Sequence, residues 1–235
     1  MVDFHTHILP KMDDGSRSSE ESVAMLRMLA EQGIKRVVLT PHYYPEAESP
    51  EDFLRRRAAS FDRLQKAIGE QPLPALHLGA EVRYYDGFSH TPSLAGLMIS
   101  GSSLMLLEMP FTGWEPRMFR EIERAQQNFG CQIILAHIER YLRFQKDAHF
   151  WENVQQTGAL VQANAEFFLS SMLARRQAIH LLRQGRVHLL GSDCHGIQKR
   201  PPRLGEAIHR IGRCLGCDAL DAVAWRGQRL FKSYT

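Results

Sequence analysis

Seven short apolar segments alternate along the chain with segments of helical periodicity, and this alternation restricts the fold more than any other feature of the sequence. Each gap between the apolar segments is long enough to hold a helix. Apolar strands that are separated by helices form parallel sheets with helices covering their faces. The predicted strands are Val2–Phe4, Ile34–Thr40, Ala75–Ala80, Ser103–Leu107, Gln132–Ala136, Ala159–Ala163 and Val187–Ser192.

The intervening helices carry boundary signals. Ser18 and Glu21 form a capping box at the start of the first helix, which ends at Gly33. Ser49-Pro50 begins the second, which ends before Gly69. Further helices are expected over Glu115–Phe129, 147–157, 171–184, 203–213 and 218–231. We therefore predict an α/β fold with one domain over residues 1–235 and the sheet closed into a barrel, with an open doubly wound sheet as the alternative.

Composition excludes several classes of protein. The 235 residues are 44% hydrophobic and 23% charged, as expected for a globular chain with a core. No apolar run approaches the roughly 18 residues of a membrane-spanning helix. The formal charge, 29 − 26 = +3, is too small and too dispersed for a nucleic-acid-binding surface. The first residues show no secretory signal, so we expect a cytoplasmic protein with reduced cysteines and no membrane span.

Imidazoles and carboxylates follow six of the seven predicted strands. In a parallel barrel the carboxyl ends of all strands meet on one face, so we expect these side chains to converge there. Packed carboxylates repel one another unless cations lie between them, and a mixed nitrogen and oxygen set suits zinc, manganese or iron. Nine candidate ligands are enough for two or three ions: His5, His7, Asp14, His42, Glu81, Glu108, His137, Asp193 and His195. The sixth strand offers only Asn164, to which we assign no role.

These segments together resemble the polymerase-and-histidinol-phosphatase (PHP) superfamily, and within it the bacterial tyrosine phosphatases associated with capsule and exopolysaccharide synthesis. The Asp-x-His-x-His start alone indicates only the superfamily, whereas the DDG, AHIERY and RPP segments indicate the branch. The matching segments are Asp3-Phe4-His5-Thr6-His7, Asp13-Asp14-Gly15, Thr40-Pro41-His42, Gly79-Ala80-Glu81, Leu107-Glu108, Ala136-His137-Ile138-Glu139-Arg140-Tyr141, Ser192-Asp193-Cys194-His195 and Arg200-Pro201-Pro202.

The resemblance implies a distorted (β/α)7 TIM-like barrel that holds three divalent ions, with manganese expected first and iron or zinc as alternatives. It implies that the nine candidate residues are the ligands and that Arg140 and Arg200 bind phosphate. One ion would use His5, His7 and Asp193, and a second Glu108 and His137, with Glu81 bridging the two. Asp14, His42 and His195 would hold the third. The implied substrate is a phosphotyrosine protein, the tail of a bacterial tyrosine autokinase.

Other interpretations of the same residues remain open from the sequence. A histidinol-phosphate-type phosphatase could use the same scaffold, and a nuclease or a metal-stabilised binding module are further alternatives. Cys194 and Arg200 match the spacing of cysteine-dependent phosphatases, which we disfavour because the intervening segment is not glycine-rich and two candidate ligands flank the thiol. Cys214 and Cys217 form an isolated CxxC that we interpret as incidental, and Arg55–Arg57 as a solvated helix face. Five tyrosines could stack on a substrate ring: Tyr43, Tyr44, Tyr84, Tyr85 and Tyr141.

Overall fold

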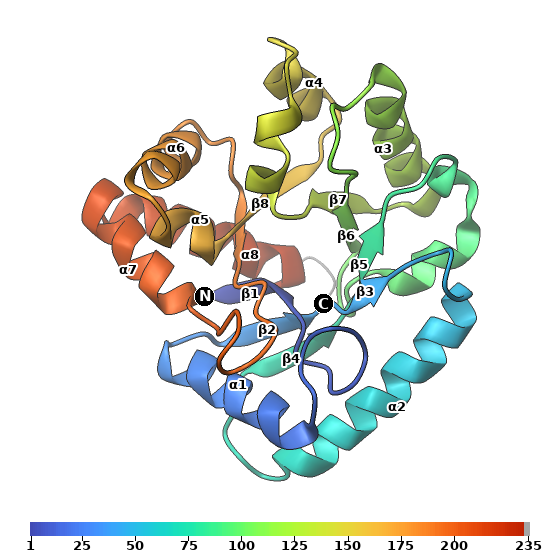
Figure 1. Ribbon diagram of the computed structural model, residues 1–235, viewed down its shortest axis with the longest axis vertical. Helices are drawn as coiled ribbons and strands as arrows, with labels where there is room; N and C mark the ends of the chain where they lie inside the picture. The colour runs from blue at the N-terminus through green and yellow to red at the C-terminus, as the bar shows by residue number, and fades with distance from the viewer. Residues whose placement is uncertain (233–235) are drawn as a thin grey trace.

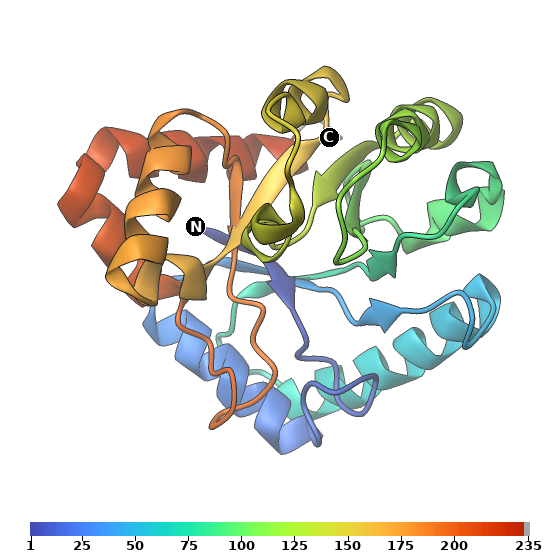
Figure 2. The ribbon, with the colours of Figure 1, turned by 45° about the horizontal axis from the view of Figure 1, so that its top comes forward.

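Parallel strands curl around a common axis in the computed structural model, which describes residues 1–232, and helices surround them (Figures 1 and 2). Two ladders make up the sheet, one in the order β1-β2-β4 and the other in the order β3-β5-β6-β7-β8-β9. The strands are β1 (Val2–Thr6), β2 (Arg36–Leu39), β3 (His42–Tyr43), β4 (Ala75–Leu78), β5 (Glu81–Arg83), β6 (Leu104–Glu108), β7 (Gln132–Leu135), β8 (Leu160–Asn164) and β9 (Leu189–Gly191).

The first and last strands meet, which brings the two ends of the sheet together. Thr6 forms an isolated parallel bridge with Cys194. Asp193 N donates to His5 O at 2.8 Å, and His7 N donates to Cys194 O at 3.0 Å. The curled parallel sheet therefore has the distorted barrel form that the sequence predicts, and the open doubly wound alternative is wrong.

The barrel is distorted because the second and third predicted strands are each interrupted. The first break falls at Thr40-Pro41, where proline has no N–H to donate to a ladder, and separates β2 from β3. The second falls at Gly79-Ala80 and separates β4 from β5. Each break changes the direction of the chain just before a candidate ligand, because β3 begins with His42 and β5 begins with Glu81. His42 and Glu81 are then neighbours in the parallel register of β3 and β5.

The predicted helices are present, with their expected boundary signals. Ser18 caps the first by accepting from Glu21 N, and Ser49 caps the second by accepting from Asp52 N. The helices are α1 (Ser19–Glu31), α2 (Pro50–Ile68), α3 (Pro116–Phe129), α4 (Phe150–Gln156), α5 (Ala165–Leu169), α6 (Met172–Arg183), α7 (Leu204–Leu215) and α8 (Cys217–Lys232). Short 3₁₀ turns are η1 (Phe88–His90), η2 (Pro92–Leu97), η3 (Ile138–Arg140) and η4 (Leu142–Phe144). Helix α5 and the 3₁₀ turns were not predicted. Within residues 1–232, no helix has the length and apolar content needed to cross a membrane.

The three consecutive arginines of α2 do not share one environment. The Arg55 side chain is exposed and that of Arg56 pairs with Glu48, as a solvated face requires. Arg57 instead lies on the buried face of α2 and donates from Nη1 to Gly79 O at 2.7 Å. It thereby satisfies a carbonyl at the β4–β5 break. The solvated-face interpretation is wrong for Arg57, because the turn of the helix places it on the same side as Phe53 and Leu64.

His188 gives the fold a pH dependence that is independent of the candidate ligands. Its Nδ1 accepts from Val161 N at 2.9 Å, and burial, with a smaller contribution from the charge of Arg226, lowers its pKa to about 4. Because the unfolded chain takes up this proton first, stability should fall as the pH drops from about 6.5 towards 4. The His188→Asn variant keeps an acceptor but cannot titrate. We expect it to lose about 2 kcal/mol less unfolding free energy between pH 7 and pH 4.5 in urea titrations with EDTA. Parallel curves for the two proteins would contradict this.

Candidate metal centre

All nine candidate ligands lie together at the carboxyl end of the sheet. The β1 segment supplies His5 and, just beyond its end, His7, and the loop before α1 supplies Asp14. The other elements deliver one or two residues each. These are His42 in β3, Glu81 in β5, Glu108 at the end of β6, His137 after β7, and Asp193 and His195 after β9. All are buried or half-buried except Asp14, whose side chain reaches in from the exposed loop.

Glu81 is the centre of this cluster. Its Oε1 lies 2.7 Å from His137 Nε2. Its Oε2 lies 2.9 Å from His42 Nδ1, 3.2 Å from His5 Nε2 and 3.4 Å from His7 Nε2. The carboxylate therefore faces four imidazoles at once, which matches the bridging position expected for it.

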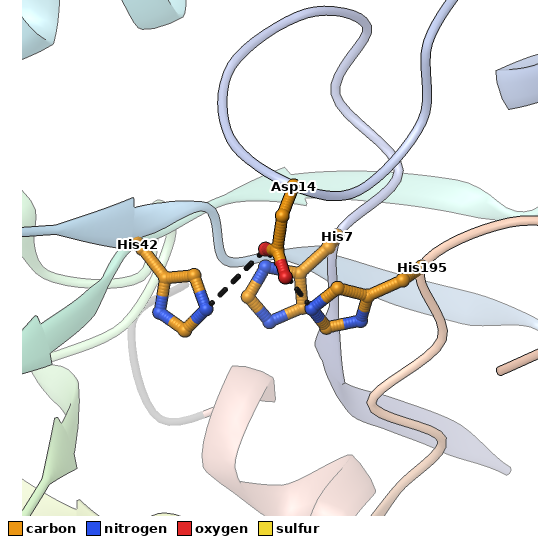
Figure 3. A group of neighbouring side chains, drawn as sticks. All are labelled: His7, Asp14, His42 and His195. Carbon is orange, nitrogen blue, oxygen red and sulfur yellow. Dashed lines mark ion pairs between the residues drawn. The ribbon is translucent and has the colours of Figure 1, made fainter. Parts of the chain in front are cut away.

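A second group lies where the exposed Asp14 side chain meets the cluster, on a side that we call the mouth of the site (Figure 3). Asp14 Oδ1 lies 3.3 Å from His195 Nε2 and 3.6 Å from His42 Nε2. The ring of His7 lies between them, with its centroid 3.9 Å from that of His195 and 4.5 Å from that of His42. The expected set of Asp14, His42 and His195 is thus assembled, with His7 beside it.

The nitrogen and oxygen atoms of these side chains are arranged as ligands of divalent cations would be, and not as a network of hydrogen bonds. Glu81 Oε2 and His42 Nδ1 are buried and only 2.9 Å apart, yet neither has a partner in hydrogen-bond geometry. His5 Nε2 and His7 Nε2 also face each other at 3.1 Å. Nitrogen and oxygen ligand atoms that converge on one region in this way are typical of a coordination sphere. In addition to the group at the mouth, two sets have ligand atoms within 4.8 Å of one another: His5, His7 and Glu81, and His42, Glu81 and Glu108. In the second set His42 stands where we expected His137, although His137 Nε2 lies 3.4 Å from Glu108 Oε1.

Asp193 joins the imidazole cluster to the two arginines. Its Oδ1 lies 3.4 Å from His7 Nε2 and 3.6 Å from His5 Nε2. Its Oδ2 is contacted by Arg140 Nη2 and, at 2.5 Å, by Arg200 Nη2. Both guanidiniums are partly exposed, so they form a positive edge between the buried carboxylate and solvent.

The pKa values show which protonation states this packing favours. Burial lowers the pKa of His195 to about 4, and the charges of His7 and Arg200 act in the same direction. Burial alone would raise the pKa of Asp193, but His5, His7 and Arg140 hold it well below its usual range. For His137 burial acts to lower the pKa, but contacts with Glu108 and Glu81 raise it to about 9. A cation bound to His137 must therefore displace a proton.

Backbone strain is concentrated at the same place. Four non-glycine residues in the described chain have positive φ, and three of them belong to the candidate site: His137 at 29°, Asp193 at 51° and Arg200 at 50°. Such conformations persist only where the surroundings enforce them. Arg200 O accepts from His195 N at 2.9 Å, which closes the loop that carries Arg200 back onto the site.

A family model described as "Capsular polysaccharide synthesis, CpsB/CapC" matches residues 1–229 of the chain. This chain belongs to the CpsB/CapC family. The tyrosine-protein phosphatase YwqE of Bacillus subtilis is 26% identical over 240 residues, which cover 100% of this chain and 93% of that protein. The tyrosine-protein phosphatase CpsB of Streptococcus agalactiae is 27% identical over 231 residues, with coverages of 92% and 91%.

Solved structures confirm the fold. A structure described as YwqE from Bacillus subtilis and CpsB from Streptococcus pneumoniae, "unique metal-dependent tyrosine phosphatases", superposes with a TM-score of 0.86 at 23% identity. The superposition covers 100% of this chain and 96% of the chain in that structure. A histidinol phosphate phosphatase from Lactococcus lactis reaches a TM-score of 0.54 at 14% identity, with 93% of each chain covered. The predicted resemblance to the capsule-associated tyrosine phosphatases is confirmed.

The cysteines of this CpsB/CapC chain have no visible part in the site. Cys194 is fully buried between two candidate ligands, and burial raises the pKa of its thiol to about 12. A thiol so rarely ionised is a poor nucleophile. Cys214 and Cys217 are exposed on either side of the turn between α7 and α8.

Replacing Cys194 with serine should therefore leave most of the phosphatase activity, within about three-fold, because the change removes only a buried sulfur. Activity should be measured after confirming by elemental analysis that the variant carries as much metal as the unmodified protein. A fully loaded but inactive Cys194→Ser variant would show that the thiol is the nucleophile.

The structure narrows the predicted set of ring-stacking tyrosines. Tyr43 and Tyr141 are buried, and the Tyr141 hydroxyl accepts from Met109 N at 2.9 Å, so neither can stack on a substrate. Tyr84 is also buried, and Tyr85 is half-buried with its hydroxyl bonded to Thr91. Tyr44 alone stacks on a candidate ligand, with its ring centroid 5.2 Å from that of His42.

Two residues near the site were missed by the sequence analysis. Asp13 Oδ2 accepts from His7 Nδ1 at 2.7 Å and from His42 N at 2.9 Å, so it orients two candidate ligands. Phe111, whose ring centroid lies 6.2 Å from that of His137 in a stacked arrangement, is 45% exposed. The adjacent acidic pair at 13 and 14 was a usable signal for Asp13, whereas a single phenylalanine in a loop gives none.

Proposed function

We propose that this chain is a metal-dependent protein-tyrosine phosphatase and that it works as one domain over residues 1–235. The observation that carries the proposal is the convergence of five imidazoles and four carboxylates beside the two arginines. This arrangement supplies many cation ligands and a positive edge where a phosphate dianion can bind. Membership of the CpsB/CapC family and the relatives named tyrosine-protein phosphatases support the choice of substrate. A histidinol-phosphate substrate is the alternative from the sequence. The histidinol phosphate phosphatase structure superposes on this chain much less well than the tyrosine phosphatase structure does.

The nine candidate residues would hold three divalent ions, with manganese expected first and iron or zinc as alternatives. When bound there, such ions would supply Lewis-acid chemistry toward a phosphoryl group and lower the pKa of water. Glu81 would bridge two of them, since each of its oxygens faces a different set of imidazoles. Asp193 would present Oδ1 to the ion near His5 and His7 while its Oδ2 keeps the arginines in place.

Arg140 and Arg200 would bind the phosphoryl oxygens. Their guanidiniums approach the same carboxylate oxygen, and Arg200 Nη1 also lies 2.8 Å from His195 Nε2, so both are held at one edge of the cluster. Planar guanidinium forks are suited to holding phosphate oxygens in fixed orientations. The rigid sequence Pro201-Pro202, which follows Arg200 directly, limits the freedom of that loop.

Phe111 and Tyr44 would contact the aromatic ring of the substrate from the mouth of the site. Both rings already stack on candidate ligands, His137 and His42, and Phe111 is 45% exposed. We expect Phe111→Ala to raise KM for a phosphotyrosine peptide by about five- to ten-fold, from the loss of about 1 kcal/mol of aromatic contact. The same change should leave KM for phosphoserine nearly unaltered. Equal effects on both substrates would contradict the ring contact.

The substrate we propose is the phosphotyrosine-bearing tail of a bacterial tyrosine autokinase in the cytoplasm. A flexible tail can bring a phosphotyrosine to a centre that lies among buried side chains, whereas a tyrosine on a rigid surface cannot reach it as easily. This part of the proposal rests on the capsule-synthesis description of the family.

The test is a comparison of kcat/KM for phosphotyrosine peptides, phosphoserine peptides, histidinol phosphate and oligonucleotides, with manganese present and after EDTA. We expect phosphotyrosine to be preferred by at least ten-fold and EDTA to abolish turnover until manganese is restored. A ten-fold preference for histidinol phosphate would place the chain among small-molecule phosphatases. Activity that survives chelation would overturn the metal-dependent mechanism.

A further inference from the structure

Strand β8 delivers no imidazole or carboxylate to the site, but it places two amides there. Gln162 and Asn164 are two residues apart, so both project from the same face of the strand. Both are buried, although buried amides are costly unless their polar atoms are hydrogen-bonded. Their partners are the candidate ligands.

Each hydrogen bond of the pair can be assigned a direction. His137 N can only donate, and its partner at 2.8 Å is Gln162 Oε1. Gln162 Nε2 donates to Asn164 Oδ1 at 2.9 Å, and Asn164 Nδ2 donates to Asp193 Oδ2 at 2.7 Å. The backbone N–H at one end and the carboxylate at the other fix both amide orientations. If both amides were reversed, two donors would face each other at His137 N and two acceptors would face each other at Asp193 Oδ2.

This direction determines the tautomer of His5. The ring atom His5 Nδ1 lies 3.3 Å from Gln162 Oε1, which is an acceptor, so His5 Nδ1 carries the proton. In the neutral ring Nε2 then carries the lone pair, and that atom faces Glu81 Oε2, Asp193 Oδ1 and His7 Nε2. The same pair of amides therefore fixes both the imidazole and the carboxylate that face one position.

Gly191 provides independent support. It lies on β9, paired with Asn164 in the parallel register. A Cβ atom at this position would lie 2.6 Å from His5 Cβ and 2.8 Å from Gln162 Nε2. The neighbouring strand thus leaves room for the amide pair and the imidazole to lie side by side.

We propose that Gln162 and Asn164 are positioning residues that hold His5 and Asp193 in the tautomer and orientation needed to bind one shared divalent cation. The inference rests on the proposed function, because it takes His5 and Asp193 as ligands. Partners of metal ligands in comparable positions change metal affinity by 10- to 100-fold when they are removed.

Two variants test this, each with a matched control. Gln162→Met keeps the length of the side chain but removes both polar atoms, and Gln132→Met makes the same change on β7, where the Gln132 amide bonds only Gly158 O. Asn164→Asp replaces the donor to Asp193 with an anionic oxygen. Asn153→Asp does the same where Asn153 Nδ2 donates to Asp147 Oδ2 at 3.1 Å, on the surface. Added negative charge alone would strengthen cation binding, whereas loss of positioning weakens it.

The measurement is calorimetric titration of manganese into the metal-free proteins, with thermal unfolding to confirm that each is folded. Gln162→Met and Asn164→Asp should bind one ion at least ten-fold more weakly, and the controls should bind as the unmodified protein does. In the zinc-loaded protein, long-range ¹H–¹⁵N spectra should show a slowly exchanging His5 Nδ1 proton that is lost in Gln162→Met.

The outcomes separate the two proposals. Folded variants that bind manganese unchanged would overturn the positioning role and leave the proposed function intact. An unmodified protein that binds no divalent ion would overturn the proposed function, and the positioning role with it. If Gln162→Met fails to fold, the manganese affinity of Asn164→Asp tests the positioning role by itself. Unfolding of both variants with folded controls would assign the amide pair to stability alone and also overturn the proposal.

Discussion

A Glu81→Gln variant should lose at least one bound ion. Its phosphatase activity should fall by at least 1000-fold, which corresponds to about 4 kcal/mol of activation free energy. The carboxylate faces His137 through Oε1 and His42, His5 and His7 through Oε2, and no other candidate ligand is so central. The amide keeps the shape but removes the charge and turns one acceptor into a donor. Metal content by elemental analysis and phosphate release in manganese are the measurements.

Glu121→Gln is the matched control for this change. Glu121 is also a buried glutamate, but its Oε2 accepts from Ser89 Oγ at 2.8 Å, in a contact with η1 that lies outside the site. We expect this variant to keep its metal and its activity even if its thermal stability falls. A folded Glu81→Gln protein with its full metal complement and normal turnover would contradict the role of Glu81 as a bridging ligand.

Alanine in place of Arg140 or Arg200 should lower kcat/KM for phosphotyrosine by about 30- to 1000-fold, or roughly 2–4 kcal/mol, while the ions stay bound. The expectation of retained metal has a structural reason. Asp193 Oδ2 would still accept from Asn164 Nδ2, and its Oδ1 would still face His5 and His7. Phosphate should bind more weakly as a competitive inhibitor in both variants, because the guanidiniums are proposed to hold its oxygens.

Two comparisons sharpen the result for the arginines. Arg143→Ala removes a guanidinium from the adjacent turn η4, where Arg143 stacks on Phe144, and it should have no more than a small effect. Lysine at 140 or 200 keeps the charge without the planar fork, so it should restore only part of the lost activity. Loss of bound metal from Arg140→Ala or Arg200→Ala would show that these residues stabilise the metal centre instead of binding phosphate.

Much of the fold was accessible from local sequence signals. Ser18 and Ser49 predicted helix starts because a capping side chain satisfies backbone N–H groups only a few residues away. The candidate ligands were accessible for a related reason: parallel strands align their carboxyl ends, so a polar residue just after an apolar run must lie on one shared face. The structure brings all nine together as that argument requires, although their binding of metal stays a prediction.

Only the tertiary structure decided how those residues are held. His5 and Gln162 are 157 positions apart, and no local pattern links them. The burial of Arg57 against Gly79 O and of Tyr141 against Met109 N likewise depends on segments distant in the sequence. The amino-acid sequence by itself determined the alternation of strands and helices, the face on which the polar groups gather and the family. Hydrogen-bond partners and tautomers depend on which distant atoms the closed sheet brings within about 3 Å.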